Sequence, residues 1–251
     1  MSEAMEAEFD TVAEWTARVA TDLGPEYHIP AACRGSGSPA ALDWLIDRMR
    51  LSPNDSLLDS GAGVGGPAAY AAQSVAITPV LVEPEGGACR AARKLFGYPV
   101  VRGLGSALPI ADATFDAAWS LGVMCTTPHQ LELLRELRRT VRPGGRIGLL
   151  VFAARQPVDE GQPEGNYFPT SDRIVELVDE TGLHIEEWRC TAELPPIPRN
   201  WNDRVDAVER ALADRYGGTR AWQLAERQSS RIGQLLEQGA VTGEMLVLRR
   251  P

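Results

Sequence analysis

A glycine-rich turn preceded by an aspartate is the segment of this sequence best suited to chemistry. It lies in residues 57–72, LLDSGAGVGGPAAYAA, where a short apolar run ends in Asp59. The turn contains Gly61, Gly63, Gly65 and Gly66. Glycine tolerates positive φ and lets backbone pass close to a ligand, and open α/β sheets bind ligands at the carboxyl ends of their strands. The stretch therefore predicts a ligand site with a backbone floor and a carboxylate beside it.

Two classes of ligand are compatible with this turn. Gly61, Gly63 and Gly66 satisfy the GxGxxG spacing of dinucleotide-binding proteins, and Glu83 follows about twenty residues later, as in those proteins. A carboxylate at Asp59, however, suits a ligand with an ammonium group and would repel a pyrophosphate. The turn also follows about sixty residues of helical material, whereas dinucleotide domains often open the chain. These features favour a ligand that carries an amino group.

The elements that position the turn alternate between strand and helix. Short apolar runs predict buried strands at 56–59, 80–83, 100–102, 117–120 and 147–152. Residues 184–190 are strand-like, and a final strand is predicted at 244–248. Helical periodicity predicts helices over 9–23, from Pro39 onward, and over 67–73, 86–95, 131–141, 171–181, 203–216 and 220–237. Residues 24–38 are predicted to form a loop, and Pro143-Gly144-Gly145 a turn that ends a helix. This alternation predicts right-handed βαβ units around a parallel sheet.

Composition excludes several functional classes. The net charge of −9 argues against a nucleic-acid partner, and the arginines of 135–146 alternate with leucines as on a solvated helix face. No run approaches eighteen apolar residues, and the acidic start lacks a signal peptide's basic region, so a cytoplasmic protein without a membrane partner is expected. The four cysteines form no CxxC pair, so neither a metal site nor a disulfide framework is expected.

Four ordered stretches resemble the class I S-adenosylmethionine (SAM)-dependent methyltransferases, especially bacterial enzymes acting on small molecules. DSGAGVGG (59–66) is similar to the family's DxGxGxG loop, and VEP (82–84) to its second strand. VRGLGSALPIADATFDAAWS (101–120) resembles the stretch that passes the adenine, and LRELRRTVRPGGRIGLLVF (134–152) the following helix, turn and strand. The resemblance implies an α/β, Rossmann-like fold. The expected fold has a seven-stranded, mostly parallel sheet with helices on both faces and an antiparallel last strand. A helical lid is expected from the N-terminus and from the insert before the last strand.

The resemblance also implies which residues would bind the cofactor, SAM, or its product S-adenosylhomocysteine (SAH). The loop would hold the methionine part, and Glu83 at a strand end would accept hydrogen bonds from the ribose hydroxyls. The full expected set is Asp59, Gly61, Ala62, Gly63, Gly65, Glu83, Pro84, Gly105, Ser106, Leu121 and Gly122. Arg34 is a further candidate, as a partner for the SAM carboxylate. The alternative, that Arg34 is an ordinary surface residue, agrees equally well with the sequence.

The sequence departs from the family at two places. Leu104 stands where the family usually has an acidic residue that accepts a hydrogen bond from the adenine amino group. Here the ring would be recognised by the backbone of Gly105 and Ser106, or by packing of Leu104 against it. Relatives often carry a histidine around the position of Cys125 and Thr126, and neither residue is an obvious base. These departures leave open a weaker affinity for SAM or a product-like ligand.

Methyl transfer from a sulfonium requires positioning and, for some acceptors, a base. The candidate catalytic residues are His28, in the predicted 24–38 loop, and His129, which alternatively caps the helix that follows it. Tyr167 is a further candidate base. Tyr27, Tyr167 and Trp201 are expected to line the substrate pocket, with packing inside the lid as the alternative.

The sequence therefore predicts one SAM-dependent methyltransferase domain over 1–251. It comprises an N-terminal helical cap (1–50), a SAM-binding core (51–155) and a C-terminal part (156–251) with a helical insert at about 200–238. The expected reaction is methylation of an O or N atom, with C-methylation possible, of a small-molecule metabolite. A SAM- or SAH-binding protein without transfer is the alternative, and a nicotinamide oxidoreductase is favoured only by the glycine spacing. The sequence does not distinguish a monomer from a homodimer.

Overall fold

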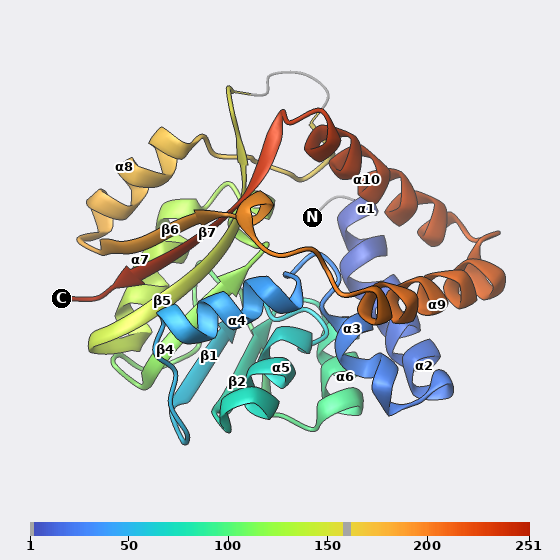
Figure 1. Cartoon of the computed structure of the whole chain (residues 1–251), viewed down its shortest axis with the longest axis horizontal. Coiled ribbons are helices and arrows are strands. Elements are labelled where there is room, and N and C mark those ends of the chain that lie inside the picture. The colour runs from blue at the N-terminus through green and yellow to red at the C-terminus, as the bar shows by residue number, and fades with distance from the viewer. Residues whose placement is uncertain (1–2, 158–161) are drawn as a thin grey trace.

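The centre of the protein is a seven-stranded sheet, seen in the computed structural model, which describes residues 3–157 and 162–251 (Figure 1). Its strands are β1 (Ser56–Ser60), β2 (Thr78–Glu83), β3 (Val100–Arg102), β4 (Phe115–Leu121), β5 (Val141–Ala154), β6 (His184–Cys190) and β7 (Val241–Arg249). The spatial order is β3-β2-β1-β4-β5-β7-β6. Strands β1 to β5 pair in parallel, and β7 is antiparallel to both β5 and β6. The predicted fold class is confirmed.

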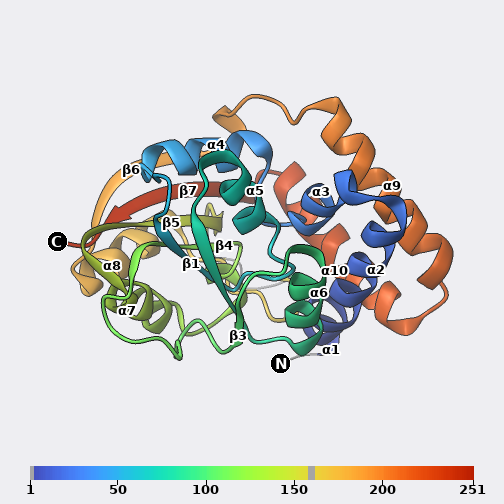
Figure 2. The same ribbon diagram turned by 90° about the horizontal axis from the view of Figure 1, so that it is seen from below.

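Each face of the sheet is covered by its own layer of helices because successive strand side chains point to opposite faces. Leu57 belongs to one core with α4 (Pro39–Arg48), α5 (Gly66–Val75) and α6 (Gly86–Phe96). Its neighbour Leu58 belongs to a second core with α7 (Gln130–Thr140) and α8 (Ser171–Thr181). Figure 2 shows α4 and α5 on one side of the strands and α7 and α8 on the other. The site is thus carried by a sheet buried on both faces.

The remaining α-helices and the π-helix η1 gather into one unit, here called the helical cap. It comprises α1 (Glu3–Glu6), the π-helix η1 (Ala7–Val12), α2 (Ala13–Leu23), α3 (His28–Ala32), α9 (Arg199–Tyr216) and α10 (Arg220–Glu237). These segments, far apart in the sequence, lie together on the right in Figure 1. Trp15 stacks on Tyr216 with ring centroids 4.1 Å apart, and Arg215 pairs with Asp22 at 2.6 Å. The predicted N-terminal and insert helices therefore form one packed group.

The structure corrects two local predictions. Within 24–38, predicted to be a loop, a short 3-10 helix (Pro25–Tyr27) leads into α3, and Pro30, Ala31, Ala32 and Cys33 are buried. Burial of these small residues against α5 outweighs the loop-forming composition of the segment. The Pro143-Gly144-Gly145 stretch lies inside the first part of β5 rather than forming a separate turn, since α7 ends at Thr140 and β5 begins at Val141.

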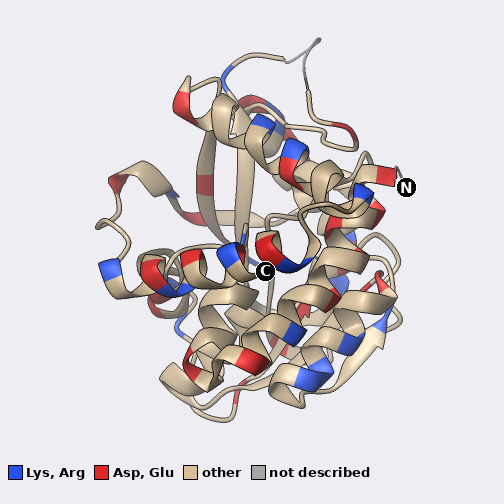
Figure 3. Ribbon diagram, turned by 90° about the vertical axis from the view of Figure 1, so that its right-hand side faces the viewer, with Lys and Arg blue, Asp and Glu red and all other residues tan. Residues whose placement is uncertain are grey.

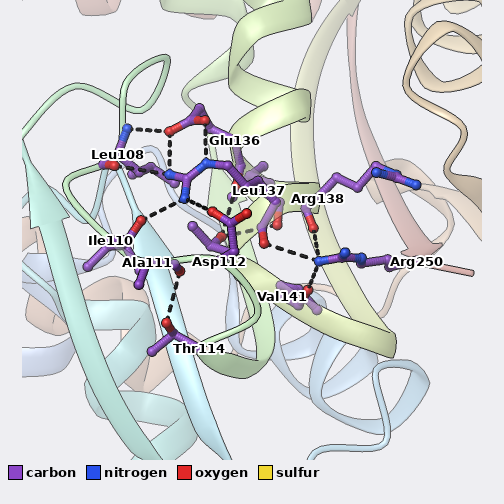
Figure 4. A network of polar contacts seen from close by, with 12 residues as sticks. Leu108, Ile110, Ala111, Asp112, Thr114, Glu136, Leu137, Arg138, Val141 and Arg250 are labelled. Carbon is purple, nitrogen blue, oxygen red and sulfur yellow. Dashed lines mark hydrogen bonds and ion pairs between the residues drawn. The ribbon is translucent and has the colours of Figure 1, made fainter.

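Among the basic residues of 135–146, Arg139 contributes most clearly to the fold. Arg139 on α7 donates to Glu136, to Asp112 at 2.7 Å and to the carbonyls of Leu108 and Ile110, which Figure 4 shows in one network. Glu136 also accepts from the backbone N–H of Leu108 at 2.7 Å. The network ties the loop after β3 to α7, so this arginine points into the protein rather than to an external phosphate.

Candidate cofactor site

The glycine-rich turn joins β1 to α5 in a conformation that requires glycine. Gly61 and Gly65 have φ of +75° and +85°. A Cβ on Gly61 would overlap the Val123 side chain, and one on Gly65 would lie 2.9 Å from Leu81 Cδ1. The Gly61 N–H donates to the Val82 carbonyl at 2.8 Å, which fixes the turn to the end of β2. Backbone therefore forms the floor of the site, as predicted from the sequence.

Asp59 lies at the edge of this floor as a buried carboxylate. Its residue is 2% exposed, and Oδ2 has no hydrogen-bond partner among the described residues. Burial raises the pKa of Asp59 to about 7; the Trp119 indole opposes this rise and the Glu83 charge adds to it. Ser60 Oγ and Trp119 Nε1 are also buried without partners of ordinary geometry. Because native proteins pair nearly all buried polar groups, these atoms at neighbouring strands mark a place where a polar ligand fits.

Glu83 ends β2 and lies beside the turn. Its Oε2 accepts from the Gly63 N–H at 2.8 Å, and its Oε1 accepts from the Glu85 N–H at 3.0 Å. Burial raises the pKa of Glu83 to about 7, the backbone hydrogen bonds oppose the rise, and the charges of Glu85 and Asp10 add to it. Each carboxylate oxygen has a second lone pair, so both can still accept from a diol.

Residues 32–36, which lead out of α3, cross the carboxyl ends of β1 and β4 and are here called the covering segment. A Cβ on Gly66 would overlap the Ala32 carbonyl group, and one on Gly122 would lie 2.8 Å from the Gly35 carbonyl oxygen. Cys33 is buried, and the nearby Asp59 charge adds to the effect of burial in raising the pKa of its thiol. The covering segment therefore closes the site from above the turn.

A second cover comes from η1. The Asp10 carboxylate accepts from the Gly87 N–H at the first turn of α6, and a Cβ on Gly87 would overlap the Asp10 backbone. Burial raises the pKa of Glu85, and the Asp10 charge adds to this rise. Three carboxylates thus meet beside the end of β2, and η1 holds them against the start of α6.

The loop after β3 forms the third side. A Cβ on Gly105 would lie 2.8 Å from Leu133 Cδ1 and 3.1 Å from Ser60 Oγ, so this loop passes above the end of β1. Leu104 is 58% exposed and forms an isolated bridge with Ala107. Ser106 is half-buried next to it. The Arg139 network fixes the same loop at Leu108 and Ile110.

The structure therefore brings most of the predicted cofactor residues to one edge of the sheet. Leu121 ends β4, Gly122 follows it with φ of +79°, and Ala62 and Pro84 lie in the turn and just after β2. Arg34 belongs to the covering segment, but its Nε lies 3.4 Å from Glu209 Oε1 of α9. In this arrangement the Arg34 side chain faces the cap helices.

The predicted base and pocket residues are spread over different places. His28 packs edge-on against Phe96 of α6, with centroids 6.4 Å apart, and burial lowers its pKa. His129 is exposed at the start of α7, where its side chain makes no capping hydrogen bond. Tyr167 is 45% exposed, and its backbone binds Cys125 and Gln130 in the region after β4.

Two further predicted pocket residues have partners elsewhere. Tyr27 packs with the hydrophobic core of the cap, and Trp201 lies edge-on to Tyr70 of α5 at 6.1 Å. Tyr70 in turn donates to Asp43 of α4. The structure thus brings His129 and Tyr167 to the region after β4, while His28, Tyr27 and Trp201 belong to other packing groups.

Sequence reasoning missed the residues that close the site. Val123 explains why Gly61 must be glycine, Asp10 binds the start of α6, and Trp119 lies beside Asp59. The signals were weak, since Asp10 stands in an ordinary amphipathic pattern and Trp119 in an apolar strand. Their roles arise from contacts between segments that only the folded chain brings together.

Strand order, the antiparallel β7 and the glycine-floored site together define the class I methyltransferase fold. A family profile described as a methyltransferase domain matches residues 58–149. Over this core, the chain is similar to the methyltransferase domain family. No helix in the described part of the chain is long and apolar enough to cross a membrane.

Relatives and neighbouring structures agree with this assignment. A 24-methylenesterol C-methyltransferase 2 from Oryza sativa subsp. japonica is 36% identical over 201 residues, covering 70% of this chain and 55% of that protein. Methyltransferase GfsG of Streptomyces halstedii is 31% identical over 125 residues, covering 47% and 45%. The chain thus spans about half the length of these relatives; others carry the names of O- and N-methyltransferases. The crystal structure of the [4+2]-cyclase SpnF superposes with a TM-score of 0.67 at 22% identity, covering 84% of this chain and 80% of that one.

Proposed function

We propose that this protein is a SAM-dependent methyltransferase that acts on an O or N atom, or a C atom, of a small-molecule metabolite. The observation that carries the proposal is the buried Asp59 carboxylate, whose Oδ2 has no hydrogen-bond partner, beside a glycine floor, with Glu83 at the next strand end, inside the family-matched core. An ammonium group and a vicinal diol are the ligand groups that suit these two carboxylates. Both belong to SAM and to SAH, and the family match favours them over a nicotinamide dinucleotide.

The chain's residues fit this cofactor at three points. Asp59 would pair with the ammonium group of the methionine part, Glu83 would accept from the ribose hydroxyls, and backbone of Gly105 and Ser106 would contact the adenine edge. When bound, SAM supplies a methyl group activated by a positively charged sulfur. The protein contributes binding, orientation and the exclusion of water by the covering segment and η1.

The catalytic base is the least constrained part of the proposal. His129 and Tyr167 lie in the region after β4, next to the proposed cofactor, and are the candidates that the geometry supports best. His28 packs on the flank of α6, so a role as base would require movement of α3. An acceptor whose attacking atom is already uncharged and nucleophilic needs no base from the protein.

A SAM- or SAH-binding protein without methyl transfer is the second candidate. Leu104 provides no acceptor for the adenine amino group, the candidate bases are dispersed, and one structural neighbour is titled as a cyclase. The fold thus also occurs in a protein named for different chemistry. In either case we propose a single domain that works in the cytoplasm on a small molecule, without a membrane or nucleic-acid partner.

Calorimetric titration with SAM, SAH and NADH tests the cofactor. Binding of SAM and SAH without NADH is expected, and binding of NADH alone would overturn the proposal. Incubation with SAM carrying a labelled methyl group and a panel of small amines, alcohols and phenols then separates the two candidates. Label transferred to an acceptor supports the methyltransferase, whereas tight SAM binding with no transfer to any member favours the binding protein.

A further inference from the structure

Trp119 and Asp59 lie side by side on neighbouring strands of the sheet. In the parallel pairing of β1 with β4 they are partners in register, so their side chains point to the same face. That face is the one covered by α4 and α5, since Leu57, two residues before Asp59, belongs to the same core as Trp119. Trp119 and Asp59 are 0% and 2% exposed. An indole N–H and a carboxylate therefore share a place from which bulk water is excluded.

The position of the indole is fixed by the strand on its other side. Gly148 of β5 is the partner of Trp119 in register. A Cβ on Gly148 would lie 3.4 Å from Trp119 Cβ and 2.5 Å from Met49 Sδ. Glycine at this position thus leaves room for the large ring, and close packing in the core restricts the ring to few orientations. The indole is held beside Asp59 before any ligand arrives.

The polar groups of this pair are incomplete. Trp119 Nε1 and Asp59 Oδ2 are both buried without a hydrogen-bond partner of ordinary geometry among the described residues. Burial raises the pKa of Asp59 to about 7, the Trp119 N–H opposes the rise, and the Glu83 charge adds to it. Cys33 of the covering segment is a further titratable neighbour. Because an indole can only donate, its N–H favours the ionised carboxylate, which is the form that an ammonium group needs.

A second pair of a tryptophan and a carboxylate in the same sheet is complete. Trp188 Nε1 of β6 donates to Glu244 Oε2 of β7 at 2.7 Å, and Glu244 Oε1 accepts from Thr242 Oγ1 at 2.7 Å. Glu244 is buried as well, yet each of its carboxylate oxygens has a partner. This pair lies at the β6 edge of the sheet, away from the glycine floor. The pair that lacks a partner is thus the one beside the proposed ligand site.

The charged residues on the surface of the cap are mixed in sign. Figure 3, which views this side of the molecule, shows acidic and basic residues interspersed over the cap helices. Steering of a charged ligand requires a surface region of one sign, and this mixed surface does not provide it. Recognition of an ammonium group therefore depends on the buried pair.

We propose that Trp119 is a positioning residue of the cofactor site: its indole N–H holds one oxygen of the Asp59 carboxylate and keeps the other, Oδ2, available to the ammonium group of the ligand. This inference rests on the proposed function for the identity of the ligand but not for the contact between the two residues. When the ligand binds, a proton on Asp59 leaves to solvent, and the bond from the indole becomes charge-assisted and roughly twice as strong. Trp119 thus stabilises the bound state more than the free state.

The ligand-free wild type tests the contact directly. In protein labelled with ¹⁵N and ¹³C, triple-resonance spectra assign the indole signals. The Trp119 signal should titrate with the Asp59 carboxylate, at a midpoint near 7, and the Trp188 signal should not follow it. Because the pKa of Glu83 is also about 7, Asp59→Asn is the control and should abolish the Trp119 titration. A Trp119 signal that is independent of pH, or one that still titrates in Asp59→Asn, would overturn the inference.

Trp119→Phe removes the donor and keeps an aromatic ring, and Trp188→Phe is the matched control at the complete pair. By calorimetry at pH 7, Trp119→Phe should bind SAH about tenfold more weakly, the loss expected for one hydrogen bond to a charged group. An ionised Asp59 is required for the ammonium contact, so SAH affinity should fall on acidification. In Trp119→Phe this fall should begin about one pH unit higher, because Asp59 has lost the donor that favours its charge. Trp188→Phe should match the wild type in both respects.

The outcomes separate this inference from the proposed function. A Trp119→Phe protein that binds SAH with wild-type affinity and pH dependence would overturn the role of the indole and leave the proposed cofactor intact. A wild type that binds neither SAM nor SAH, but whose Trp119 signal follows Asp59, would refute the proposed function and leave the contact intact. If Trp119→Phe does not fold, the wild-type titration and its loss in Asp59→Asn still decide the question.

Discussion

The floor of the site and the helical cap above it are built in different ways. The floor consists of one continuous stretch, from Asp59 to α5, together with the ends of neighbouring strands, and most of its contacts are backbone hydrogen bonds. The cap joins segments nearly two hundred residues apart, such as Asp22 and Arg215, through side chains. The floor therefore tolerates few substitutions, whereas the cap can change its lining without losing the fold. This difference suits the proposed function, in which the cofactor is common to many enzymes and the acceptor is specific to one of them.

The largest expected effect is a loss of stability on substitution of Gly61 in the floor of the site. Gly61→Ala introduces a Cβ at φ of +75° that overlaps Val123, and strain plus overpacking should lower the free energy of unfolding by about 3 kcal/mol. Gly63→Ala is the matched control, because its φ is +52° but no atom lies within 4 Å of the added Cβ. It should cost only about 1 kcal/mol. Urea unfolding measures both, and equal losses would show that the contact with Val123 is unimportant.

Removing the Glu83 carboxylate should weaken the cofactor more than any change in the cap. Glu83→Ala deletes two proposed bonds to the ribose, and at roughly 1.5 kcal/mol each the affinity for SAH should fall about a hundredfold. Calorimetry measures the change, with the melting temperature as a check on folding. Because Glu83 also holds the Gly63 and Glu85 N–H groups, Glu83→Gln serves as the conservative comparison and should lose less. An unchanged dissociation constant for Glu83→Ala would contradict the placement of the ribose.

Replacing Asp59 should raise the stability of the ligand-free protein and weaken cofactor binding. Its pKa is raised from 3.8 to about 7 in the folded protein, so the folded state holds a proton that the unfolded state has released. Stability of the ligand-free protein should therefore fall as pH rises from about 4 to 7, and level off above that. Asp59→Asn removes the part of this dependence that comes from Asp59, while the part from Glu83 remains, and it should raise the melting temperature at pH 8 by ~3–6 °C. The same variant should bind SAH about tenfold more weakly through loss of a charged hydrogen bond, and tighter binding would contradict the ammonium contact.

The smallest expected effect concerns the exposed edge of the site. Leu104→Asp would restore an acceptor for the adenine amino group and should tighten SAH binding modestly, by about threefold for one exposed polar contact. Wild-type protein should discriminate little against adenosine analogues that lack this amino group. Strong wild-type discrimination would mean that another residue already recognises the amino group.

The same contrast explains what the sequence could predict. The strand pattern, the glycine turn, Asp59 and Glu83 follow from local residue types, because strand ends and tight turns have strong local signals. The helical character of α3 did not, since its Gly-, Pro- and Ser-rich surroundings favour a loop. Packing against α5 and against α2 and α9 of the cap stabilises it as a helix. His28 is held by its contact with Phe96, and Trp201 by its contact with Tyr70. Neither contact produces a periodic pattern in the sequence, so neither position could be predicted.

The burial of Asp59 and Glu83, which are 2% and 5% exposed, has a kinetic consequence. We expect a ligand that pairs with both carboxylates to reach them when the covering segment or η1 moves aside, which would make association a two-step process. Ordinary association proceeds at about 10⁵–10⁷ M⁻¹s⁻¹ and slows when a conformational change must come first. In stopped-flow mixing, the observed rate should rise with ligand concentration and then level off at the opening rate of the cap. That plateau would measure the rate at which the cap opens. It would also set an upper limit on turnover, whatever the rate of the chemical step.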